Sequence, residues 1–511
     1  MSSAPPSTFS WPSSPPPPPK TQEQTIRDPS TKLDILIIGA GLGGLGTAIS
    51  LLLAGHSVLI LESAASLTEI GAGIQCLPNS TRILKRWGLE PHLEPHLTRP
   101  RRCNLRGWKG EVISSMDFWE YEGVLGTPFW DFHRAGLQGA LVGRVEELGG
   151  RVRTGCRVVD VQAEVVLQSG ERIRADLVIG ADGINSKCRE ILLGRKDPPI
   201  PTGDLAYRLL LKTEEMMKDP ELRRFVEDPQ VNYWMGPDAH AVNYVLRGGQ
   251  LFNMVLLVPD DMPAGATTLE GNVSEMRALF RDWDPRIPKL LSLCDSVYKW
   301  RLCIRPDLSP SWSHPSGTFT MLGDAVHATL PYLASGAGMS LEDAAVLGEC
   351  LGRVRGRGRG EKMRALAVYE GCRRGRTGRV VQRGNLQQEL YHLHDGAEQR
   401  ERDRVMRAWG SVGERVKGGE DVGTVVEEMG LERESDTLPW RFGGVGSWLL
   451  TYDAKEDVER NWGSLNDTKT WLVQSSTVEL NHDQFWSLPV VHVVHMAEYL
   501  FLNHVSTNHH M

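Results

Sequence analysis

The chain has 511 residues, too many for one domain of ordinary size and enough for about three. Its 41% hydrophobic and 24% charged residues are typical of a folded globular protein, which excludes a chain that is disordered throughout. The formal charge of −7 lacks the basic excess expected of a dedicated nucleic-acid-binding protein.

The N-terminal segment is rich in serine and proline. Residues 1–30 contain five consecutive prolines, Pro15 to Pro19, which favour an extended conformation and cannot build a core. We therefore expect a disordered leader there, and it lacks the basic-then-apolar order of a secretory signal. No run of 18 uncharged apolar residues occurs, and the eight cysteines form no CxxC pair. These features predict a cytoplasmic protein with no conventional membrane span and no metal site.

A strand–helix–strand pattern opens the ordered part of the chain. Residues 33–38 are a short apolar run, typical of a strand buried on both faces. After a glycine-rich turn, residues 45–54 are typical of a buried helix that ends at Gly55. A second apolar strand is expected over residues 57–61.

The turn between the first strand and the helix has the spacing G-x-G-x-x-G. Gly39 permits the tight turn, Gly41 lets a pyrophosphate approach the backbone, and Gly44 lets helix and strand pack closely. The N-terminus of the following helix attracts phosphate. Glu62, 18 residues after Gly44, can accept the hydroxyls of an adenosine ribose and would repel the 2′-phosphate of NADP. This pattern predicts dinucleotide binding but does not separate FAD from NAD.

Four later motifs follow the glycine-rich turn in a fixed order. They are EIGAGIQCLPN at 69–79, FHR at 132–134, ADLVIGADGINS at 175–186 and GDAVH at 323–327. Together with the turn they resemble the FAD-dependent aromatic hydroxylases, particularly the salicylate-hydroxylase-like monooxygenases of fungal secondary metabolism. The resemblance covers about residues 33–460.

The resemblance implies an α/β fold. It consists of a Rossmann-like FAD-binding domain with three-layer architecture, an inserted, mostly antiparallel β-sheet substrate domain and a C-terminal helical region. The expected divisions are the leader (1–30), the first part of the FAD-binding domain (31–200), the substrate domain (201–310), the second part of the FAD-binding domain (311–345), the helical region (346–465) and an idiosyncratic tail (466–511).

The resemblance also implies a set of FAD contacts and NAD(P)H as a transient electron donor. The cofactor-binding residues are Gly39, Gly41, Gly44, Glu62, Ala72, Gly73, Arg134, Asp182, Gly183, Asp324 and Ala337. Asp182 and Asp324 each follow a buried apolar run, so they are expected at the carboxyl ends of strands, where open α/β sheets bind ligands. The alternative is that these two carboxylates only cap turns or helices.

Alternating, aromatic-rich segments occupy the middle of the chain. Residues 232–236, 240–247 and 251–258 are typical of consecutive antiparallel strands separated by Gly-Pro-Asp and Gly-Gly turns. Such a sheet can cover a flavin and form an apolar pocket for a planar ring.

Two residues of this region are candidates for catalysis. In the resembling hydroxylases an arginine and a tyrosine at the positions of Arg208 and Tyr244 hold the substrate as phenolate. A guanidinium lowers the pKa of a nearby phenol, and the ionised ring is a better nucleophile. The alternatives are an ion pair with a surface acid for Arg208 and a core tyrosine with a bonded hydroxyl for Tyr244.

Other candidate residues have plainer interpretations. His327 is expected to be a hydrogen-bonded histidine near the flavin rather than an acid–base catalyst. His392 and His394 are two residues apart, which does not suit a metal site on one helix face. The arginine–glycine segment 353–360 is expected to be a solvated loop rather than an RNA-binding segment. The tail has the alternative of an amphipathic helix on a membrane surface.

The sequence thus predicts an FAD-dependent monooxygenase that uses NAD(P)H and O₂ to hydroxylate a phenolic or other electron-rich aromatic, such as a polyketide-type metabolite. The resemblance implies oxygen transfer from a flavin hydroperoxide, with the redox chemistry belonging to the cofactor. Two alternatives stay open: a flavin oxidoreductase without oxygen insertion, and a non-catalytic flavin-binding scaffold. No nucleic-acid partner is expected.

Overall fold

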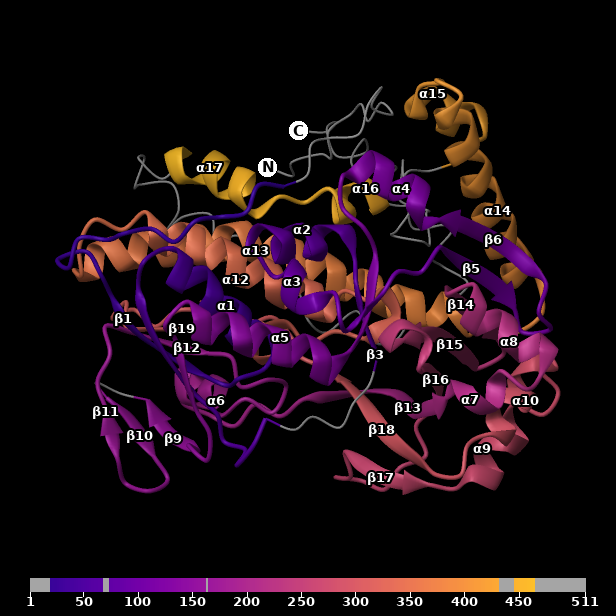
Figure 1. Cartoon of the computed structure of the whole chain (residues 1–511), viewed down its shortest axis with the longest axis horizontal. Helices are drawn as coiled ribbons and strands as arrows, with labels where there is room; N and C mark the ends of the chain where they lie inside the picture. The colour runs from indigo at the N-terminus through magenta and orange to yellow at the C-terminus, as the bar shows by residue number, and fades with distance from the viewer. Residues whose placement is uncertain (1–18, 68–72, 162–163, 432–444, 465–511) are drawn as a thin grey trace, which may run out of the picture. The chain divides into compact units, whose positions relative to one another are not determined.

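The computed structural model describes residues 19–67, 73–161, 164–431 and 445–464 (Figure 1). By its internal contacts the chain divides into one unit of residues 1–462 and another of residues 463–511. The account below concerns the first unit. Most of the expected leader and the whole of the tail 466–511 lie outside the described residues.

A parallel sheet carries the glycine-rich turn. Its five strands, in spatial order, are β19 (Phe319–Met321), β12 (Leu177–Gly180), β1 (Asp34–Ile38), β2 (Ser57–Leu61) and β8 (Arg151–Arg153). All four pairings are parallel. Strands β1 and β12 are almost completely buried, which explains their continuous apolar sequences. The Rossmann-like arrangement predicted from the sequence is confirmed.

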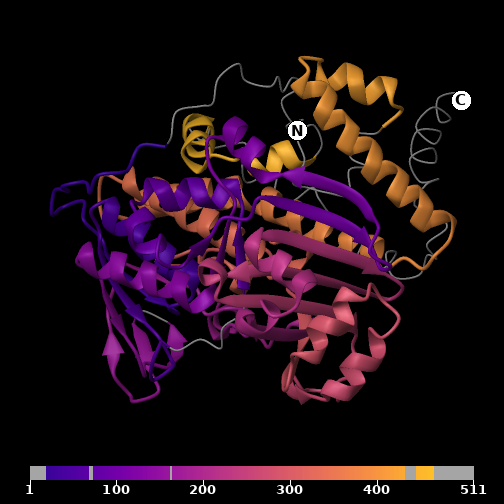
Figure 2. The ribbon, with the colours of Figure 1, turned by 45° about the vertical axis from the view of Figure 1, so that its right-hand side comes forward.

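Helices cover this sheet on one side and a small sheet lies away from them, as both views of the chain show (Figures 1 and 2). The covering helices are α1 (Leu42–Leu53), α5 (Arg134–Glu147), α12 (Gly336–Gly352) and α13 (Arg359–Tyr391). The small antiparallel sheet consists of β9 (Val158–Val161), β10 (Val165–Leu167) and β11 (Arg172–Ile173). These layers agree with the predicted three-layer architecture. Helix α1 packs closely on α12 because Gly348 leaves space for Ser50.

A sheet of eight strands forms the second large part of the unit. In spatial order its strands are β17 (Thr268–Gly271), β18 (Val297–Ile304), β13 (Ile200–Lys212), β16 (Leu251–Pro259), β15 (Ala239–Leu246), β14 (Gln230–Gly236), β5 (Arg102–Gly107) and β6 (Val112–Asp117). Every pairing is antiparallel except that of β14 with β5. The predicted antiparallel strands are confirmed, and β5 and β6, which precede residue 200, extend the same sheet.

The two faces of this sheet have different partners. On strand β13, Leu205, Tyr207 and Leu209 belong to an apolar cluster shared with the covering helices. Those helices are α7 (Thr213–Met216), α8 (Pro220–Glu227), α9 (Val273–Leu279) and α10 (Arg286–Ser292). Because side chains alternate along a strand, Ala206 and Arg208 lie on the opposite face. That opposite face is the one directed at the cavity described below.

Shorter elements connect the two parts. A three-stranded sheet is formed by β3 (Gly73–Cys76), β7 (Trp130–His133) and β4 (Leu97–Thr98). The remaining helices of the unit are α2 (Pro78–Arg86), α3 (Glu90–Leu93), α4 (Phe118–Leu125), α6 (Lys187–Leu193), α11 (Asp324–His327), α14 (Ala397–Lys417), α15 (Val422–Glu428), α16 (Val445–Leu450) and the start of α17 (Ala454–Ser464); the short 3₁₀ turns are η1 (Arg247–Gly249) and η2 (Pro331–Leu333).

The end of the expected leader departs from the prediction. Residues 19–30 have no helix or strand, but they are hydrogen-bonded to the folded unit rather than free. The Thr25 N–H donates to Leu53 O (2.8 Å), and Arg27 donates to the carbonyl oxygens of Gly352 and Val354. The serine and proline content that predicts disorder is concentrated before this stretch.

Two further sequence expectations concern the C-terminal part. Of the arginine–glycine segment, residues 353–358 form a loop before α13, and Arg357 binds the carboxylates of Asp34 and Asp176 of this same chain. Across the described ranges, none of the helices combines the length and the apolar character needed to cross a membrane.

Candidate active site

Two adjoining cavities run along the carboxyl edge of the parallel sheet. They share the lining residues Gly41, Ala181 and Gly183, so they lie next to each other, and together they are called the groove below. One end is bordered by Glu62, at the end of β2. The other end lies over the eight-stranded sheet and is bordered by Arg208 and other side chains of strands β13 to β16.

The three glycines of the turn have different surroundings. Gly39 has a φ of +107°, and a side chain on Gly44 would lie 2.0 Å from the carbonyl oxygen of Gly39. Both positions therefore need glycine for the fold of the turn itself. A side chain on Gly41 would meet no protein atom within 4 Å. The space at Gly41 is the part of the groove where a pyrophosphate was predicted.

Glu62 directly follows strand β2, at the position where the glycine-rich turn pattern predicts an acid that binds the hydroxyls of an adenosine ribose. Its carboxylate accepts hydrogen bonds from the backbone N–H groups of Ala40 and Ala64, both at 2.8 Å. These bonds fix the carboxylate at the border of the groove, and it retains lone pairs for a further donor.

Asp182 has a structural role as well as a place in the groove. Its carboxylate accepts from the Ser186 hydroxyl (2.5 Å) and from the N–H groups of Lys187 and Cys188 (2.8 and 2.9 Å), so it caps helix α6. The capping alternative therefore holds for this residue, although it also borders the groove. Gly183, with a φ of +75°, lines both cavities.

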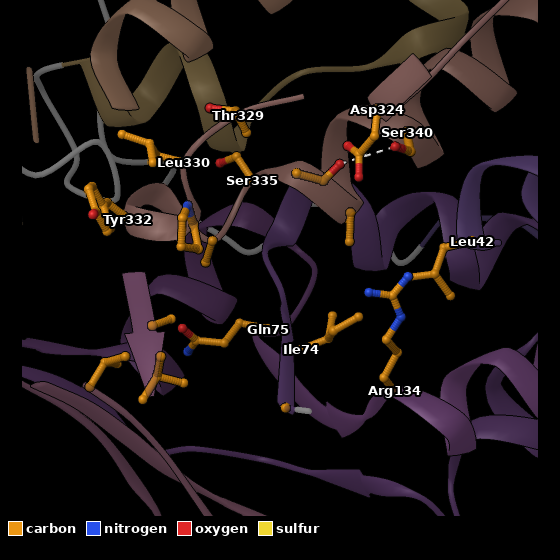
Figure 3. A pocket seen from close by; sticks show the side chains of 18 of the residues that line it. Leu42, Ile74, Gln75, Arg134, Asp324, Thr329, Leu330, Tyr332, Ser335 and Ser340 are labelled. Carbon is orange, nitrogen blue, oxygen red and sulfur yellow. Dashed lines mark hydrogen bonds between the residues drawn. The ribbon is translucent and has the colours of Figure 1, made fainter. Parts of the chain in front are cut away.

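Asp324 and Arg134 lie at the same end of the cavity that Arg208 borders, which is the second cavity, and Tyr332 lies at its opposite end (Figure 3). Asp324 is the first residue of α11 and follows the end of strand β19 by three positions. Its side chain is accessible from the cavity and is otherwise surrounded by protein atoms. Burial therefore raises the pKa of Asp324, and the charges of His327 and Arg134 oppose this rise. An acid held here can accept hydrogen bonds from hydroxyl groups of a ligand.

A buried ionic network behind Asp324 was not found by sequence reasoning. Asp343 accepts from the Gly323 N–H (2.9 Å), bonds His327 Nε2 (2.6 Å) and pairs with Arg373 (2.7 Å). Arg373 also pairs with Glu342 at 2.8 Å, and all of these side chains are buried. The network fixes the Gly323 turn, and His327 is hydrogen-bonded as predicted. The sequence did contain a signal for this network. Two adjacent acids, Glu342 and Asp343, lie inside an apolar helix, and buried carboxylates need cationic partners.

Two helix N-termini border the groove. Helix α1 begins after Gly41, and helix α12 begins after Ser335, with Ala337 in its first turn. Neither helix has a capping side chain or an acidic residue in the first turn. Their N–H groups and their positive dipole ends are therefore available for negatively charged parts of a ligand.

Gly73 contacts the predicted catalytic tyrosine. A side chain on Gly73 would lie 2.5 Å from the Tyr244 hydroxyl oxygen, so glycine is needed there for the ring of Tyr244 to pack. The Gly73 N–H donates to Asn253 Oδ1 on strand β16 at 3.0 Å. Gly73 itself lines the cavity. Ala72, the other expected cofactor contact of this segment, lies outside the described residues.

Arg208 is a cation on the cavity wall, and no acidic side chain in the described ranges pairs with it. Its guanidinium carbon lies 5.2 Å from the ring centre of Trp300. Burial, followed by the neighbouring charge of Arg134, lowers the pKa of Arg208. The alternative of a surface ion pair is thus not what the structure contains. A half-buried cation that lines a cavity attracts an anionic ligand group.

Tyr244 lies on the same face of the sheet as Arg208, with its side chain buried. Within the described parts of the chain its hydroxyl makes no hydrogen bond. The alternative interpretation, a core tyrosine with a bonded hydroxyl, would require one. Burial raises the pKa of Tyr244, with Asp131 as a further cause, and Arg208 acts in the opposite direction. The hydroxyl is therefore a neutral donor available to a ligand in the cavity.

Three aromatic side chains near the far end of the cavity were not singled out from the sequence as site residues. They are Tyr233, His240 and Tyr332. His240 precedes Tyr244 by four residues on β15, so the period of two places both on one face. Tyr332 comes from η2 and had no sequence signal of its own. With Val255 and Leu257 they give this end an apolar and aromatic lining.

The groove fits a flavin dinucleotide by three observations. The open space at Gly41 and two helix N-termini suit a pyrophosphate and other negatively charged parts of the cofactor. Acids stand at separate places, Glu62 at one end and Asp324 in the second cavity, for two sets of hydroxyl groups. The remaining aromatic end is available to a second molecule.

Comparison with known proteins gives one family and several relatives. The family described as FAD binding domain matches residues 32–384. The FAD-dependent monooxygenase OpS4 of Beauveria bassiana is 43% identical over 392 residues, which are 75% of this chain and 90% of that protein. The 3-hydroxybenzoate 6-hydroxylase 1 of Aquipseudomonas alcaligenes is 33% identical over 377 residues, covering 71% of this chain and 91% of that protein.

Solved structures share the fold. A salicylate hydroxylase in complex with its substrate aligns with a TM-score of 0.65 at 22% identity, covering 84% of this chain and 98% of that structure. The protein CtdE, solved with FAD and a substrate, aligns with a TM-score of 0.69 at 19% identity, covering 85% of this chain and 98% of that structure.

Proposed function

The chain belongs to the FAD binding domain family as an FAD-dependent monooxygenase, and we propose that it uses NAD(P)H and O₂ to hydroxylate a phenolic or other electron-rich aromatic compound. The relatives named above include a 3-hydroxybenzoate hydroxylase and a fungal monooxygenase, which supports an aromatic substrate, and among such substrates we favour a polyketide-type secondary metabolite.

The observation that carries this proposal is the pairing of two binding regions in one groove. Arg208 and Tyr244 face a cavity that is also lined by Gly41 of the glycine-rich dinucleotide turn. A substrate held beside them is adjacent to any cofactor ring that extends from the turn. This juxtaposition is what oxygen transfer from a bound flavin to an aromatic ring requires.

The residues that would hold FAD follow from the groove. Gly39, Gly41, Gly44 and Glu62 would bind the adenosine and pyrophosphate part, and the Asp324 carboxylate would accept hydrogen bonds from the ribityl chain. The other proposed contacts are Ala72, Gly73, Arg134, Asp182, Gly183 and Ala337. When bound, FAD supplies the electron transfer and the activation of oxygen that no amino-acid side chain provides.

This chain's own residues would bind, orient and ionise the substrate. The Arg208 guanidinium attracts a phenolic oxygen and lowers its pKa, because a cation stabilises the phenolate. The Tyr244 hydroxyl donates a hydrogen bond to the same or a neighbouring oxygen. The apolar lining, including Val255 and Leu257, excludes water from the ring to be hydroxylated.

The compartment and the partners complete the proposal. All eight cysteines are free thiols, and seven of them are buried, which suits a reducing cytoplasm. The partners we propose are a small aromatic substrate and O₂.

The test is oxygen incorporation. Purified holoenzyme is incubated under air with NADH or NADPH and a library of phenols, and both donor oxidation and product mass are measured. We expect substrate-stimulated donor oxidation and a product heavier by one oxygen atom, whereas donor oxidation without oxygen incorporation would contradict the proposal.

Variants locate the reaction in the proposed cavity. Arg208→Met should keep the flavin content and lower kcat/KM by at least about a hundredfold, because a cation that stabilises developing charge is lost. Tyr244→Phe should give a smaller loss. Lys212→Met is the matched control, because Lys212 is exposed at the end of the same strand as Arg208.

A further inference from the structure

Gln75 brings an amide group to the wall of the second cavity. It lies on strand β3, and Figure 3 shows it on the side of Tyr332, with Ile74 between it and Arg134. Gln75 is 9% exposed, so its amide depends on the few polar groups around it for hydrogen bonds.

Two neighbours fix the orientation of this amide. Asp131 lies directly opposite Gln75 in the pairing of β7 with β3, so the two side chains are on one face of the small sheet. Gln75 Nε2 donates to Asp131 Oδ1 at 3.3 Å, and the Tyr233 hydroxyl donates to Gln75 Oε1 at 3.4 Å. A glutamine amide has two N–H groups, and none of the described residues accepts the second one. Because the side chain lines the cavity, that N–H is available to a ligand.

Asp131, which holds the amide, is a buried carboxyl group without a counter-charge. It is 2% exposed, and no basic side chain in the described ranges pairs with it. Its Oδ2 has no hydrogen-bond partner in that part of the chain. A carboxylate in such surroundings would lose most of its solvation, so the proton stays on Oδ2 and Oδ1 accepts from Gln75. Burial accordingly raises the pKa of Asp131 well above its usual range, although the hydrogen bond from Gln75 opposes the rise.

The other groups around Asp131 are also uncharged. The titratable groups that face it are the Cys76 thiol and the hydroxyls of Tyr233 and Tyr244, and burial raises the pKa of all three. From strand β4, Thr98 lies opposite Asp131. The groups that hold the Gln75 amide are therefore neutral near neutral pH. A neutral acceptor oxygen costs less to bury beside them than a second anion does.

We propose that Gln75 binds a neutral carbonyl group of the aromatic substrate, such as that of an aryl ketone, ester or lactone, and that Asp131 is the positioning residue that holds the Gln75 amide. The inference rests on the proposed function, since it needs a phenol in the cavity. Arg208 binds the phenolic oxygen, and the second N–H of Gln75 donates to the carbonyl oxygen.

This assignment gives Gln75 a role in the choice of substrate and in its orientation. One polar contact leaves a planar ring free to rotate about that contact, whereas a second contact elsewhere on the ring fixes the rotation. The second contact thereby determines which ring carbon is nearest to the cofactor. The substrate class is an acylated phenol rather than a phenol whose only other substituents are apolar or carboxylate groups.

The experiment measures binding without turnover. Oxidised holoenzyme, with no NAD(P)H present, is titrated with 2-, 3- and 4-hydroxyacetophenone, and the dissociation constants are taken from the perturbation of the flavin spectrum. The ethylphenol and the hydroxybenzoate of each substitution pattern are titrated in the same way. The ethylphenol replaces the carbonyl oxygen by hydrogen atoms, and the hydroxybenzoate replaces the neutral carbonyl group by a carboxylate.

The variant Gln75→Met keeps the length of the side chain and removes the donor. For at least one substitution pattern we expect the affinity ratio of ketone to ethylphenol to fall by about fivefold or more, a factor within the net contribution of one hydrogen bond. Affinities for the ethylphenol, the hydroxybenzoate and FAD should change by less than about twofold. Gln250→Met, the same substitution at an exposed glutamine, should leave the ratio unaltered.

Two variants of Asp131 test its role as a neutral positioning residue. Asp131→Leu should lower the ratio as Gln75→Met does, because the amide loses the acceptor for its first N–H. Asp131→Asn keeps an uncharged acceptor and should restore the ratio. The effect of Gln75→Met should be equal at pH 6 and pH 8, because Asp131 keeps its proton at both. This pair decides the question if Gln75→Met is purified without flavin.

Several results would overturn the inference while leaving the proposed function intact. An unaltered ratio in Gln75→Met with weaker FAD binding would show that the amide faces the cofactor. An equal loss of hydroxybenzoate affinity would show that the site takes a carboxylate. A loss of the ratio in Asp131→Asn would show that Asp131 acts as an anion. Failure of the unaltered holoenzyme to bind any phenol of the series would contradict the proposed function, and this inference with it.

Discussion

Replacing Gly44 and replacing Gly41, two glycines of the same turn, should have different consequences. Gly44→Ala places a methyl group 2.0 Å from the Gly39 carbonyl oxygen and 3.4 Å from the Ala181 side chain, so the turn must open. Gly41→Ala places a methyl group in space that is free of protein atoms within 4 Å. The first change should therefore weaken the folded protein, and the second should weaken only the binding of the dinucleotide.

The magnitudes follow from opposing contributions. Alanine inside helix α1 gains about 1 kcal/mol over glycine, whereas overpacking costs typically about 1–3 kcal/mol. A contact as short as 2.0 Å to a backbone atom belongs at or beyond the upper end of that range, so we expect Gly44→Ala to lose about 2 kcal/mol of unfolding free energy. Gly41 has ordinary extended backbone angles, φ −73° and ψ 179°, that alanine adopts readily. Its replacement should change the unfolding free energy by less than about 0.5 kcal/mol.

The assay separates the two effects by using protein stripped of FAD. Thermal unfolding of the apoprotein should show a lower midpoint for Gly44→Ala and an unchanged one for Gly41→Ala. Titration with FAD, followed by quenching of its fluorescence, should show a dissociation constant at least about tenfold higher for Gly41→Ala, equivalent to about 1.4 kcal/mol. Unchanged FAD affinity in Gly41→Ala would refute the placement of the pyrophosphate, and an equally stable Gly44→Ala apoprotein would refute the contact argument.

Three further results are expected. Asp324→Ala should purify with well under one FAD per chain, and retention of stoichiometric flavin would show that this acid does not hold the cofactor. Arg373→Met removes the cation that two buried carboxylates share, although Glu342 keeps its pair with Arg376, and should cost about 3 kcal/mol in urea unfolding, whereas Arg404→Met, an exposed control, should leave the midpoint unchanged. Burial lowers the pKa of His56 from 6.5 to about 4, so the unfolded chain binds its proton first, and stability that is complete above pH 6.5 should fall by about 3 kcal/mol as the pH drops to 4. His56→Asn should flatten that part of the profile of unfolding midpoint against pH, and an identical slope would contradict the assignment.

The first strand–helix–strand unit could be predicted almost residue by residue. Its signals are local: an apolar run, a glycine spacing, a helix of small and apolar residues and an acid at the end of the next strand. Backbone conformation at Gly39 and close packing at Gly44 depend on neighbours a few residues away. The antiparallel strands around His240 and Tyr244 were predictable for the same reason, because alternation and turn residues are written within about ten positions.

The roles of charged side chains were much less accessible. Asp182 follows a buried strand, as expected, yet its carboxylate caps α6, and only the folded turn shows which N–H groups it meets. The arginine partner of Asp343, Arg373, comes from a helix that begins 16 residues later in the chain, at Arg359. Charge pairing depends on which helix faces meet, and that is settled by the packing of the whole unit.

What the sequence determined by itself is the dinucleotide-binding turn, the order of the strands and helices along the chain and the presence of an aromatic sheet, since each depends on residue pattern within a short window. Only the tertiary structure decided that Arg208 has no acidic partner in the described ranges, and that His240 and His392, 152 residues apart, bond at 2.7 Å. Contacts between distant segments arise when separate surfaces bury each other, and no local pattern specifies which side chains will then be neighbours.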